Sequence, residues 1–168
     1  MTIEFKIACS LYEHIRRDLM RQHRHAAERV GFLFCRTAQA SDETTLVLAS
    51  SYTPVADELY IRDRRVGARI DGEAIRRAME EVMQTRCGCF HVHLHGNRSI
   101  PGLSLTDQQE IPRIVECLSV AGPDSVHGIF LLSKDSCLVL ARPKRVPKLV
   151  PATRVSVVGY PIEIVEGV

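Results

Sequence analysis

The sequence predicts a single α/β domain in which helices pack on a mixed β-sheet. The chain has 168 residues, which is enough for one hydrophobic core and does not require a second. Strand-like apolar runs alternate unevenly with amphipathic helical segments. Some neighbouring strands are joined by tight turns, whereas others are separated by a helix, so antiparallel and parallel pairs are expected within one sheet.

Composition and charge exclude few functions. Hydrophobic residues make up 45% of the chain and charged residues 25%, which is ordinary for a soluble globular protein. A net charge of +2 gives no reason to expect nucleic acid or membrane as a partner. The N-terminus lacks the features of a signal peptide, and no segment reaches the ~20 apolar residues of a membrane span. We therefore expect a soluble, cytoplasmic protein.

The N-terminal part is expected to contain a strand, a helix and a β-hairpin. A short alternating run at 5–8 predicts a strand, and Ser10 begins a capping-box pattern before a helix that reaches about Arg24. The apolar run "VGFLFC" at 30–35 predicts a buried strand. The segment "TTLVLASSYTPV" at 44–55 predicts the antiparallel partner of that strand.

The middle of the chain predicts a second helix and a further strand. Residues 55–70 have a weaker pattern, with a short strand at Leu59–Arg62 and a charged loop after it. From Asp71 to about Arg86, apolar pairs repeat at helical spacing and predict a helix with one buried face. The segment "CGCFHVHLH" at 87–95 predicts the next strand.

The C-terminal part predicts one more helix and several strands. A helix is expected to begin at Ser104, with a break or kink at Pro112. The segment at 127–143 predicts two strands around the turn "SKDS". Residues 142–168 are expected to form a Pro-rich basic connector and a terminal strand-like extension, so that 1–168 make up one domain.

Three histidines alternate along the predicted strand at 87–95. His91, His93 and His95 share one face, and the apolar residues between them share the face that meets the core. Same-face neighbours lie ~6.6 Å apart along a strand, so two imidazoles can bind one ion, whereas the outer two lie ~13 Å apart. One ion can take His91 with His93, or His93 with His95. A solvent-exposed polar strand face is the alternative interpretation.

The segment after this strand favours the second pair. Ser104 and Asp107 have the spacing of an ordinary helix cap, and the loop before them returns the helix start to a place beside His95. His93, His95 and Asp107 would then form a two-histidine, one-carboxylate set with an open fourth position, the arrangement of a catalytic zinc site. His91 would lie behind these ligands and line the pocket.

Cysteines and one glutamate complete the candidate residues. The six cysteines lie mostly in apolar runs, which favours reduced core thiols over a disulfide framework. Cys87 and Cys89 share the histidine face, so a soft-metal site that uses Cys89 and His91 remains an alternative without a clear further ligand.

A catalytic zinc site also needs a carboxylate that moves protons. Glu28, at the start of a buried strand, is the candidate, although a solvated strand end is the ordinary explanation.

Taken together, these residues resemble the JAMM metalloproteases, also called the MPN or JAB1 family. The family pattern is Glu-x-x-Gly before a strand, then His-x-His, a loop and Ser-x-x-Asp. The matching segments here are Glu28-Arg-Val-Gly31, His93-Leu-His95 and Ser104-Leu-Thr-Asp107. The order of elements is also similar over roughly residues 5–141. The resemblance implies the JAMM/MPN fold, which is cytidine-deaminase-like.

The resemblance implies a site and an activity. His93, His95 and Asp107 would bind one catalytic Zn²⁺, Glu28 would be the general acid/base, and Ser104 would help to stabilise the oxyanion. Family members cleave peptide or isopeptide bonds after the C-terminal tail of ubiquitin or ubiquitin-like proteins. The expected partners are a ubiquitin-like protein or its conjugates, together with activating or conjugating enzymes.

Details of the motif resemble bacterial JAB-type members more than eukaryotic ones. Gly96 stands where the familiar eukaryotic members have proline, and the spacing to the serine is one residue longer than theirs. Some bacterial members are associated with ubiquitin-like conjugation and anti-phage defence.

Family members offer a sheet edge to the substrate tail, and the corresponding residues here are Leu59, Tyr60, Ile61 and Arg62.

Three alternatives to a deconjugating isopeptidase remain. One is a processing protease that matures a ubiquitin-like or sulfur-carrier precursor. Another is a non-catalytic MPN-type binding scaffold, although every motif position is filled here. A zinc-stabilised nucleic-acid module has only the basic segment "RPKR" in its support.

Overall fold

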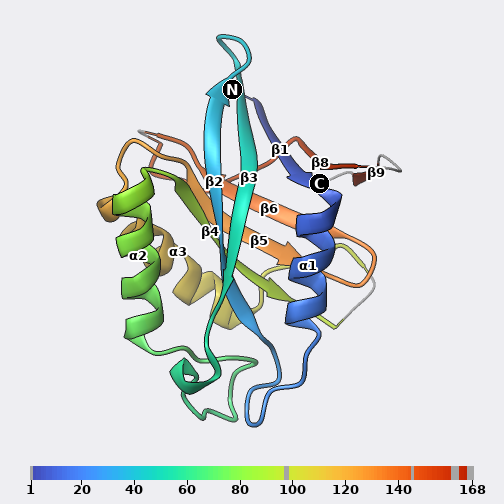
Figure 1. The fold of residues 1–168 in the computed structure, drawn as a ribbon, viewed down its shortest axis with the longest axis vertical. Helices are drawn as coiled ribbons and strands as arrows, with labels where there is room; N and C mark the ends of the chain where they lie inside the picture. Colours follow the sequence, from blue (N-terminus) through green and yellow to red (C-terminus); the bar gives the residue numbers. More distant parts are fainter. Residues whose placement is uncertain (1, 97–98, 145, 160–162, 166–168) are drawn as a thin grey trace.

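The computed structural model describes residues 2–96, 99–144, 146–159 and 163–165, which form a nine-stranded mixed sheet with three α-helices and one 3₁₀ helix, η1 (Figure 1). The predicted α/β class is therefore confirmed. The strand order is β7-β6-β5-β4-β2-β3-β1-β8-β9. The elements are β1 Thr2–Ala8, α1 Cys9–Leu19, β2 Val30–Gln39, β3 Thr44–Pro54, η1 Asp57–Leu59, α2 Gly72–Thr85, β4 Gly88–Leu94, α3 Leu105–Ala121, β5 His127–Leu132, β6 Cys137–Arg142, β7 Val150–Pro151, β8 Arg154–Val158 and β9 Glu163–Val165.

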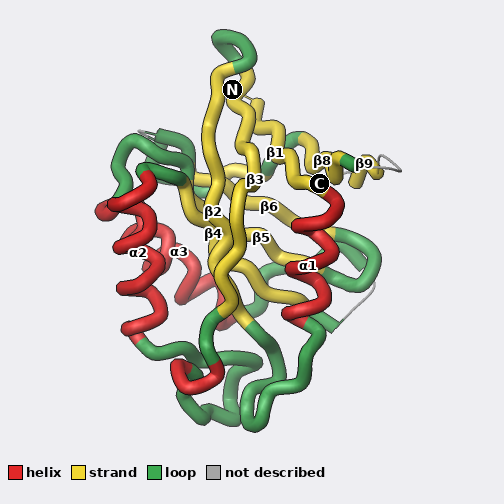
Figure 2. The backbone as a smooth tube through the Cα atoms, in the orientation of Figure 1, coloured by secondary structure: helices red, strands yellow, loops and turns green. Residues whose placement is uncertain are grey.

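The sheet combines antiparallel hairpins with parallel pairs (Figure 2). β2 and β3 form the first predicted hairpin, and β5 and β6 form the second. β4 pairs antiparallel with β2 and parallel with β5, so its backbone is hydrogen-bonded on both sides. The strand that carries the histidines is therefore held firmly inside the sheet.

Side chains of the central strands divide the core into two layers. On one face, Leu33 and Phe90 are fully buried against residues of α1. On the other face, Phe32 and Cys89 pack with buried residues of α2 and α3. The histidines of β4 have the parity of Cys89, so they face the side of the sheet that α2 and α3 cover.

The first helix begins and ends differently from the prediction. Its N-cap is Ala8, which makes no side-chain capping bond, so the expected capping box at Ser10 is wrong. The helix ends at Leu19 instead of about Arg24. The apolar repeat stops at this point, and the His23 ring closes a turn because its Nδ1 accepts hydrogen bonds from the backbone N–H groups of His25 and Ala26.

The expected strand at Leu59–Arg62 is also wrong. η1 occupies the chain up to Leu59, and Tyr60 makes one isolated bridge to Ile70 before the chain continues as a loop. Tyr60 turns inward and is buried, and its hydroxyl is hydrogen-bonded to the backbone N–H and C=O of Val30. A side chain therefore anchors this segment where a strand ladder was expected.

The second and third helices begin where the sequence predicts. Asp71 caps α2, which ends at Arg86 in the left-handed region with φ 54°. Ser104 caps α3, which continues through Pro112 to Ala121, so the helix is not broken there. Pro112 lies on the solvent side of the helix, where the carbonyl group that it leaves unbonded can be hydrated.

The C-terminal segment contains more structure than a connector. β7 pairs with β6, β8 pairs in parallel with β1, and β9 pairs antiparallel with β8. The terminal strand-like run is therefore present in its described part. Residues 145, 160–162 and 166–168 of the predicted 142–168 segment lie outside the described residues.

The helices and the cysteines agree with the expectations from composition. In the part of the chain that the structure describes, no helix is both long and apolar enough to cross a membrane. The six cysteines are free thiols, and four of them are buried in the two core layers. These four act as small core side chains.

Gly128 of β5 lies where no side chain fits. A Cβ there would be 2.0 Å from the carbonyl oxygen of Leu140 in β6, a backbone atom that cannot rotate away. We predict that Gly128→Ala lowers the free energy of unfolding by ~2–3 kcal/mol, because the two strands must move apart locally. Urea denaturation followed by circular dichroism measures this loss.

Gly72→Ala is the matched control, because a Cβ on this first residue of α2 meets no atom within 4 Å. Its free energy of unfolding should be unchanged or rise by up to ~1 kcal/mol, since alanine favours the helix. Equal stability of the two variants would contradict the close packing of β5 on β6.

Candidate metal centre

β4 presents the two candidate histidine ligands at its C-terminal end. His93 is the penultimate residue of the strand and is 3% exposed, and His95 comes directly after the strand end and is 17% exposed. The backbone N–H of His95 still donates to the carbonyl oxygen of Leu132 at 2.8 Å, so this residue keeps the direction of the strand. Both rings therefore extend from a rigid part of the sheet toward the same side.

Asp107 comes to these histidines from the first turn of α3. The predicted capping box is confirmed: Ser104 Oγ accepts from the backbone N–H of Asp107 at 3.1 Å, and Asp107 Oδ2 accepts from the backbone N–H of Ser104 at 2.8 Å. The same carboxylate has its Oδ1 3.3 Å from His93 Nε2 and its Oδ2 3.5 Å from His95 Nε2. The cap thus orients the carboxylate that faces the histidines. Residues 97–98 of the intervening loop lie outside the described residues.

The three side chains converge closely enough to share one ion. The two histidine Nε2 atoms are 3.2 Å apart, and Asp107 contacts each of them through a different carboxylate oxygen, Oδ1 for His93 and Oδ2 for His95. Atoms bonded to one small ion at ~2.0–2.1 Å in tetrahedral geometry are separated by ~3.3–3.4 Å. The carboxylate and the two rings are therefore within the range of separations found around a single ion.

Glu28 also reaches this group, from the segment just before β2. Val30 of β2 pairs with His93, and the Glu28 carboxylate lies with the ligand nitrogens of His93 and His95 in a set of atoms within 4.8 Å of one another. Glu28, His93 and His95 could therefore hold a metal ion. The site brings together four of the residues that the sequence singled out, from the end of β4, the segment before β2 and the first turn of α3.

Gly67 makes room for the Glu28 carboxylate, and sequence reasoning missed this contact. A Cβ on Gly67 would be 2.4 Å from Glu28 Oε2, and the Gly67 carbonyl oxygen accepts from the backbone N–H groups of Ala27 and Glu28 at 2.8 and 3.0 Å. The only signal was a single glycine inside the arginine-rich segment 61–70. The loop is therefore fixed directly on the glutamate.

Electrostatics favours an ionised carboxylate at Asp107. Burial opposes its ionisation, but the hydrogen bond and charge of His93, with the contacts to Ser104, outweigh burial and hold the pKa of this carboxyl well below its usual range. Asp107 is consequently a carboxylate at neutral pH. A permanently ionised oxygen ligand is suited to a divalent cation.

His91 lies behind the ligands, as the sequence predicts. Its ring centroid is 5.4 Å from that of His93 and 5.9 Å from that of Phe32. Burial, and then the charge of His93, lower the pKa of His91 to about 3. The Nδ1 atoms of His91 and His93 are buried and have no hydrogen-bond partner within the described residues. His91 is therefore a buried, neutral imidazole at neutral pH.

The cysteine alternative has less support. Cys89 is fully buried among apolar side chains, and burial, followed by the neighbouring Cys87, raises the pKa of its thiol well above the ordinary value. A thiolate ligand is therefore costly to form at this position. The backbone N–H of Cys89 donates to His127 Nδ1, which ties the strand to a buried structural histidine.

The four residues expected to contact a substrate tail fall on a folded turn. The backbone N–H of Ile61 and the C=O of Leu59 are bonded to Arg69 and Asp71 on one side. On the other side, the carbonyl of Tyr60 is bonded to the His25 ring. Pairing with an added strand would break these bonds, which leaves the exposed side chains of Ile61 and Arg62 for contact.

An open cleft lies on the histidine side of the sheet. It has a volume of about 210 Å³ and lies between the ends of β2 and β3, η1 and α2. Phe32 forms part of its wall and also contacts the His91 ring, so one side chain separates the cleft from the histidines. Its apolar walls include Phe34, Val55 and Leu59.

No protein-family model matches this chain, and no curated protein matches its sequence. Function is therefore inferred from the site.

We predict that the protein binds one divalent ion per chain and that His95→Ala weakens this binding by more than ~100-fold, because one of three converging ligands is lost. Competition with a chromogenic chelator, supported by elemental analysis, measures the affinity. His14→Ala is the control, since His14 is an exposed residue of α1. Equal affinity in His95→Ala and wild type would rule out the site described above.

The protonation of His91 predicts a dependence of stability on pH. Unfolded chains protonate histidine near pH 6.5, whereas folded His91 does so only near pH 3. The unfolded state therefore binds this proton first, so the contribution of His91 to stability is complete above about pH 6.5 and is lost as the pH falls toward 3.

The free energy of unfolding of the metal-free wild type should decrease as the pH falls. We predict that this decrease is smaller in His91→Leu, by up to ~1.4 kcal/mol per pH unit. Denaturant titrations between pH 7 and 4 provide the slopes. Parallel slopes for the variant and wild type would show that His91 does not contribute.

Proposed function

We propose that this protein is a zinc-dependent protease of the JAMM type that hydrolyses the peptide or isopeptide bond after the C-terminal tail of a ubiquitin-like protein. One observation carries the proposal. The Nε2 atoms of His93 and His95 lie 3.2 Å apart, the Asp107 carboxylate contacts them through its two oxygens at 3.3 and 3.5 Å, and the carboxylate of Glu28 lies within 4.8 Å of the two histidine ligand atoms. Three ligands and a separate carboxylate are what hydrolysis at a single metal ion requires.

The types of ligand favour zinc. Imidazole and carboxylate are a common ligand combination for catalytic zinc, which keeps one coordination position open for water or substrate. Ions such as Mg²⁺ prefer oxygen ligands, whereas two of the three ligands here are imidazole nitrogens.

The residues would divide the chemistry among them. His93, His95 and Asp107 would hold the ion, which when bound polarises the scissile carbonyl and makes water a better nucleophile. Glu28 would accept the proton of the attacking water and deliver it to the leaving nitrogen. Ser104 is hydrogen-bonded to Asp107 through its backbone and its side chain, and its hydroxyl would turn from the carboxylate to donate to the developing oxyanion.

The surroundings of the site suit a polypeptide substrate. The cleft of about 210 Å³ on the histidine side has an apolar wall that can accept aliphatic side chains. The side chains of Ile61 and Arg62 are exposed at the neighbouring loop and are proposed to contact the substrate tail, together with the partly exposed Leu59. Tyr60 is buried, so its contribution would be to support this loop.

Maturation of a ubiquitin-like or sulfur-carrier precursor uses the same chemistry and the same residues. Deconjugation and processing differ only in the group attached to the leaving nitrogen of the scissile bond. In the bacterial context that the motif resemblance implies, activating or conjugating enzymes would make the conjugate. A purely binding role leaves the convergence of Glu28 with both histidines unexplained.

We predict that the zinc-loaded protein cleaves fusions of ubiquitin-like proteins to a C-terminal reporter. Glu28→Gln should lower kcat/KM by ~10²–10⁴-fold because the proton carrier is lost. Zinc content should remain at one ion per chain. Gel analysis of the products, together with elemental analysis of each protein, measures both quantities.

Glu43→Gln is the control for the loss of one acidic charge, because Glu43 is exposed at the tip of the β2–β3 hairpin. It should cleave at the wild-type rate. Full activity of Glu28→Gln would remove Glu28 from the mechanism. Failure of the zinc-loaded wild type on every fusion, including the precursor forms, would count against the proposed protease.

A further inference from the structure

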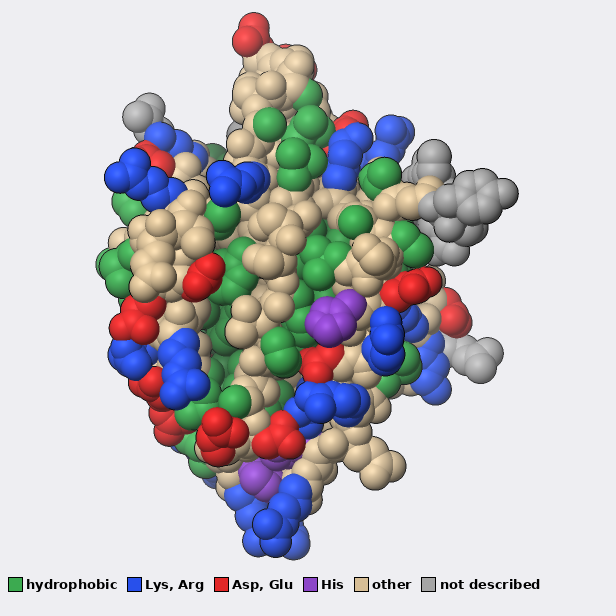
Figure 3. Space-filling model, in the orientation of Figure 1, with side chains coloured by type: hydrophobic (Ala, Val, Ile, Leu, Met, Phe, Trp, Pro, Cys, Tyr) green, Lys and Arg blue, Asp and Glu red, His purple; other side chains and the backbone are tan. Residues whose placement is uncertain are grey.

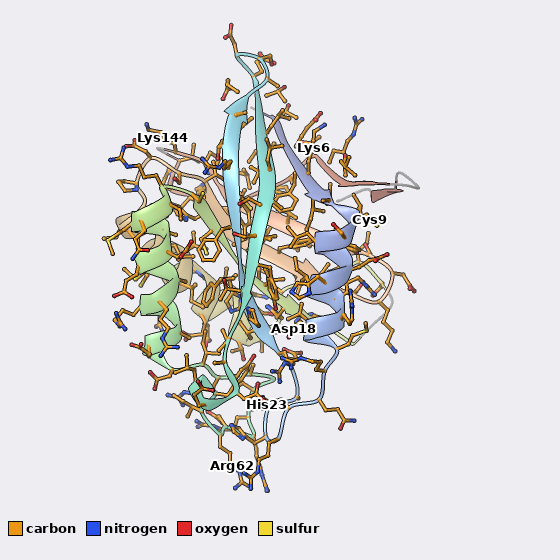
Figure 4. All side chains as sticks on the ribbon, viewed as in Figure 1. Lys6, Cys9, Asp18, His23, Arg62 and Lys144 are labelled. Atoms are coloured by element: carbon orange, nitrogen blue, oxygen red, sulfur yellow. The ribbon has the colours of Figure 1, made fainter. Side chains whose placement is uncertain are left out.

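Two arginine-rich segments meet at the end of the molecule beside Glu28. Residues 21–29 come after α1, and residues 55–70 come after β3. Side chains labelled in each segment, His23 and Arg62, lie at the same end of the fold in Figure 4. Figure 3 shows Lys and Arg side chains gathered at this tip, so we refer to residues 21–29 and 55–70 together as the basic end.

The basic end is held in place by specific contacts. The Gly67 carbonyl accepts hydrogen bonds from Ala27 and Glu28, and the ring of His23 stacks on that of Tyr60 with 4.3 Å between centroids. The N–H of Ile61 donates to the carbonyl of Arg69 at 2.8 Å, which brings the two ends of the arginine loop together. The arginines are therefore presented on a fixed loop that touches the proposed catalytic glutamate.

The charge of the basic end is not balanced by its own acids. Its two segments contain seven arginines and four carboxylates. Asp18, just before the first segment, pairs with Arg21 at 2.7 Å, so a surplus of two positive charges remains. Asp63 is already shared by Arg65 and Arg69 at 2.9 and 3.2 Å. Arg62 and Arg64 are exposed and form no ion pair with another described residue.

We infer that the basic end binds an acidic segment of the protein substrate, close to the bond that is cleaved. The inference rests on the proposed function and names the class of protein that the site accepts. A guanidinium group matches a carboxylate with two parallel hydrogen bonds, so Arg62 and Arg64 favour Asp and Glu side chains. The surplus charge would also steer an acidic partner toward Glu28.

The surface is less suited to nucleic acid. Its basic charge is interrupted by three acidic residues, Asp57, Glu58 and Asp63, which would repel neighbouring phosphates. Single-stranded nucleic acids also need exposed aromatic rings for stacking. The one aromatic residue of the two segments other than histidine is Tyr60, which is buried.

The inference is tested by the binding of a fluorescein-labelled peptide of ten glutamates to the zinc-loaded full-length chain, measured by anisotropy. Binding should weaken at least ~10-fold in the double variant Arg62→Glu/Arg64→Glu, and it should weaken with added salt. The control is Arg36→Glu/Arg154→Glu, which changes the charge equally at exposed positions of β2 and β8. This control should bind within twofold of wild type.

Two outcomes would overturn the inference. The first is that wild type does not bind the acidic peptide, or that wild type and Arg62→Glu/Arg64→Glu bind it with equal affinity. The other is tighter binding of a ten-nucleotide single-stranded DNA with the same dependence on Arg62 and Arg64, which would assign the surface to nucleic acid. Circular dichroism of both double variants confirms that they are folded.

Cleavage assays separate this inference from the proposed function. Fusions that carry either acidic or neutral residues next to the scissile bond are compared, and the acidic series should have the lower KM in wild type but not in Arg62→Glu/Arg64→Glu. Peptide binding without any cleavage would defeat the protease and leave the acidic docking surface. Cleavage that is indifferent to both the acidic residues and the arginines would defeat the docking surface and leave the protease.

Discussion

The contact of the Asp107 carboxylate with His93 and His95 is the interaction on which the site depends. It joins the first turn of α3 to the end of β4, and it adds a polar contact to the apolar packing of α3 against this strand. A carboxylate with so little exposure requires strong partners to stay ionised. The capping box supplies one of them, because the backbone N–H of Ser104 donates to the same carboxylate that faces the rings. Helix capping and metal binding thus use the same two residues, and neither role excludes the other.

The second requirement is that Glu28 stays beside the ligands without joining the sheet. It lies just before β2, where the strand pairing with β4 begins, so the ladder alone does not hold it. The Gly67 carbonyl oxygen accepts a hydrogen bond from the backbone N–H of Glu28, and the lack of a side chain on Gly67 leaves space for the Glu28 carboxylate. The Tyr60 hydroxyl accepts a hydrogen bond from the backbone N–H of Val30, two residues further along the chain. The buried Arg29, paired with Asp57, ties the same turn to η1. Glu28 is therefore positioned by contacts with the loop at 55–70 and not by the hydrogen bonds of the sheet.

Local patterns in the sequence were sufficient for the sheet strands, α2, α3 and the approach of Asp107 to the histidines. Alternation placed the histidines on one face, and the spacing of Ser104 and Asp107 marked a helix start. The turn at Leu59–Arg62 was not accessible in this way, because it depends on contacts between distant segments: the His23 ring packs on Tyr60, and the Tyr60 hydroxyl reaches Val30. The end of α1 at Leu19 coincides with the end of the apolar repeat, which the prediction extended to about Arg24. The contact of Gly67 with Glu28 is likewise between residues 39 positions apart, and no periodic pattern records it.

The buried Nδ1 atom of His93 has a consequence for the exchange of metal. Without an ion, the ring can keep its hydrogen on Nε2 and donate it to Asp107 at 3.3 Å. Coordination through Nε2 moves that hydrogen to Nδ1, where the described residues offer no acceptor. Most ligand histidines in proteins are oriented by an acceptor at this second nitrogen. Loading the site would therefore require a change of tautomer as well as the capture of an ion, so the buried surroundings of His93 Nδ1 would lower the affinity for metal.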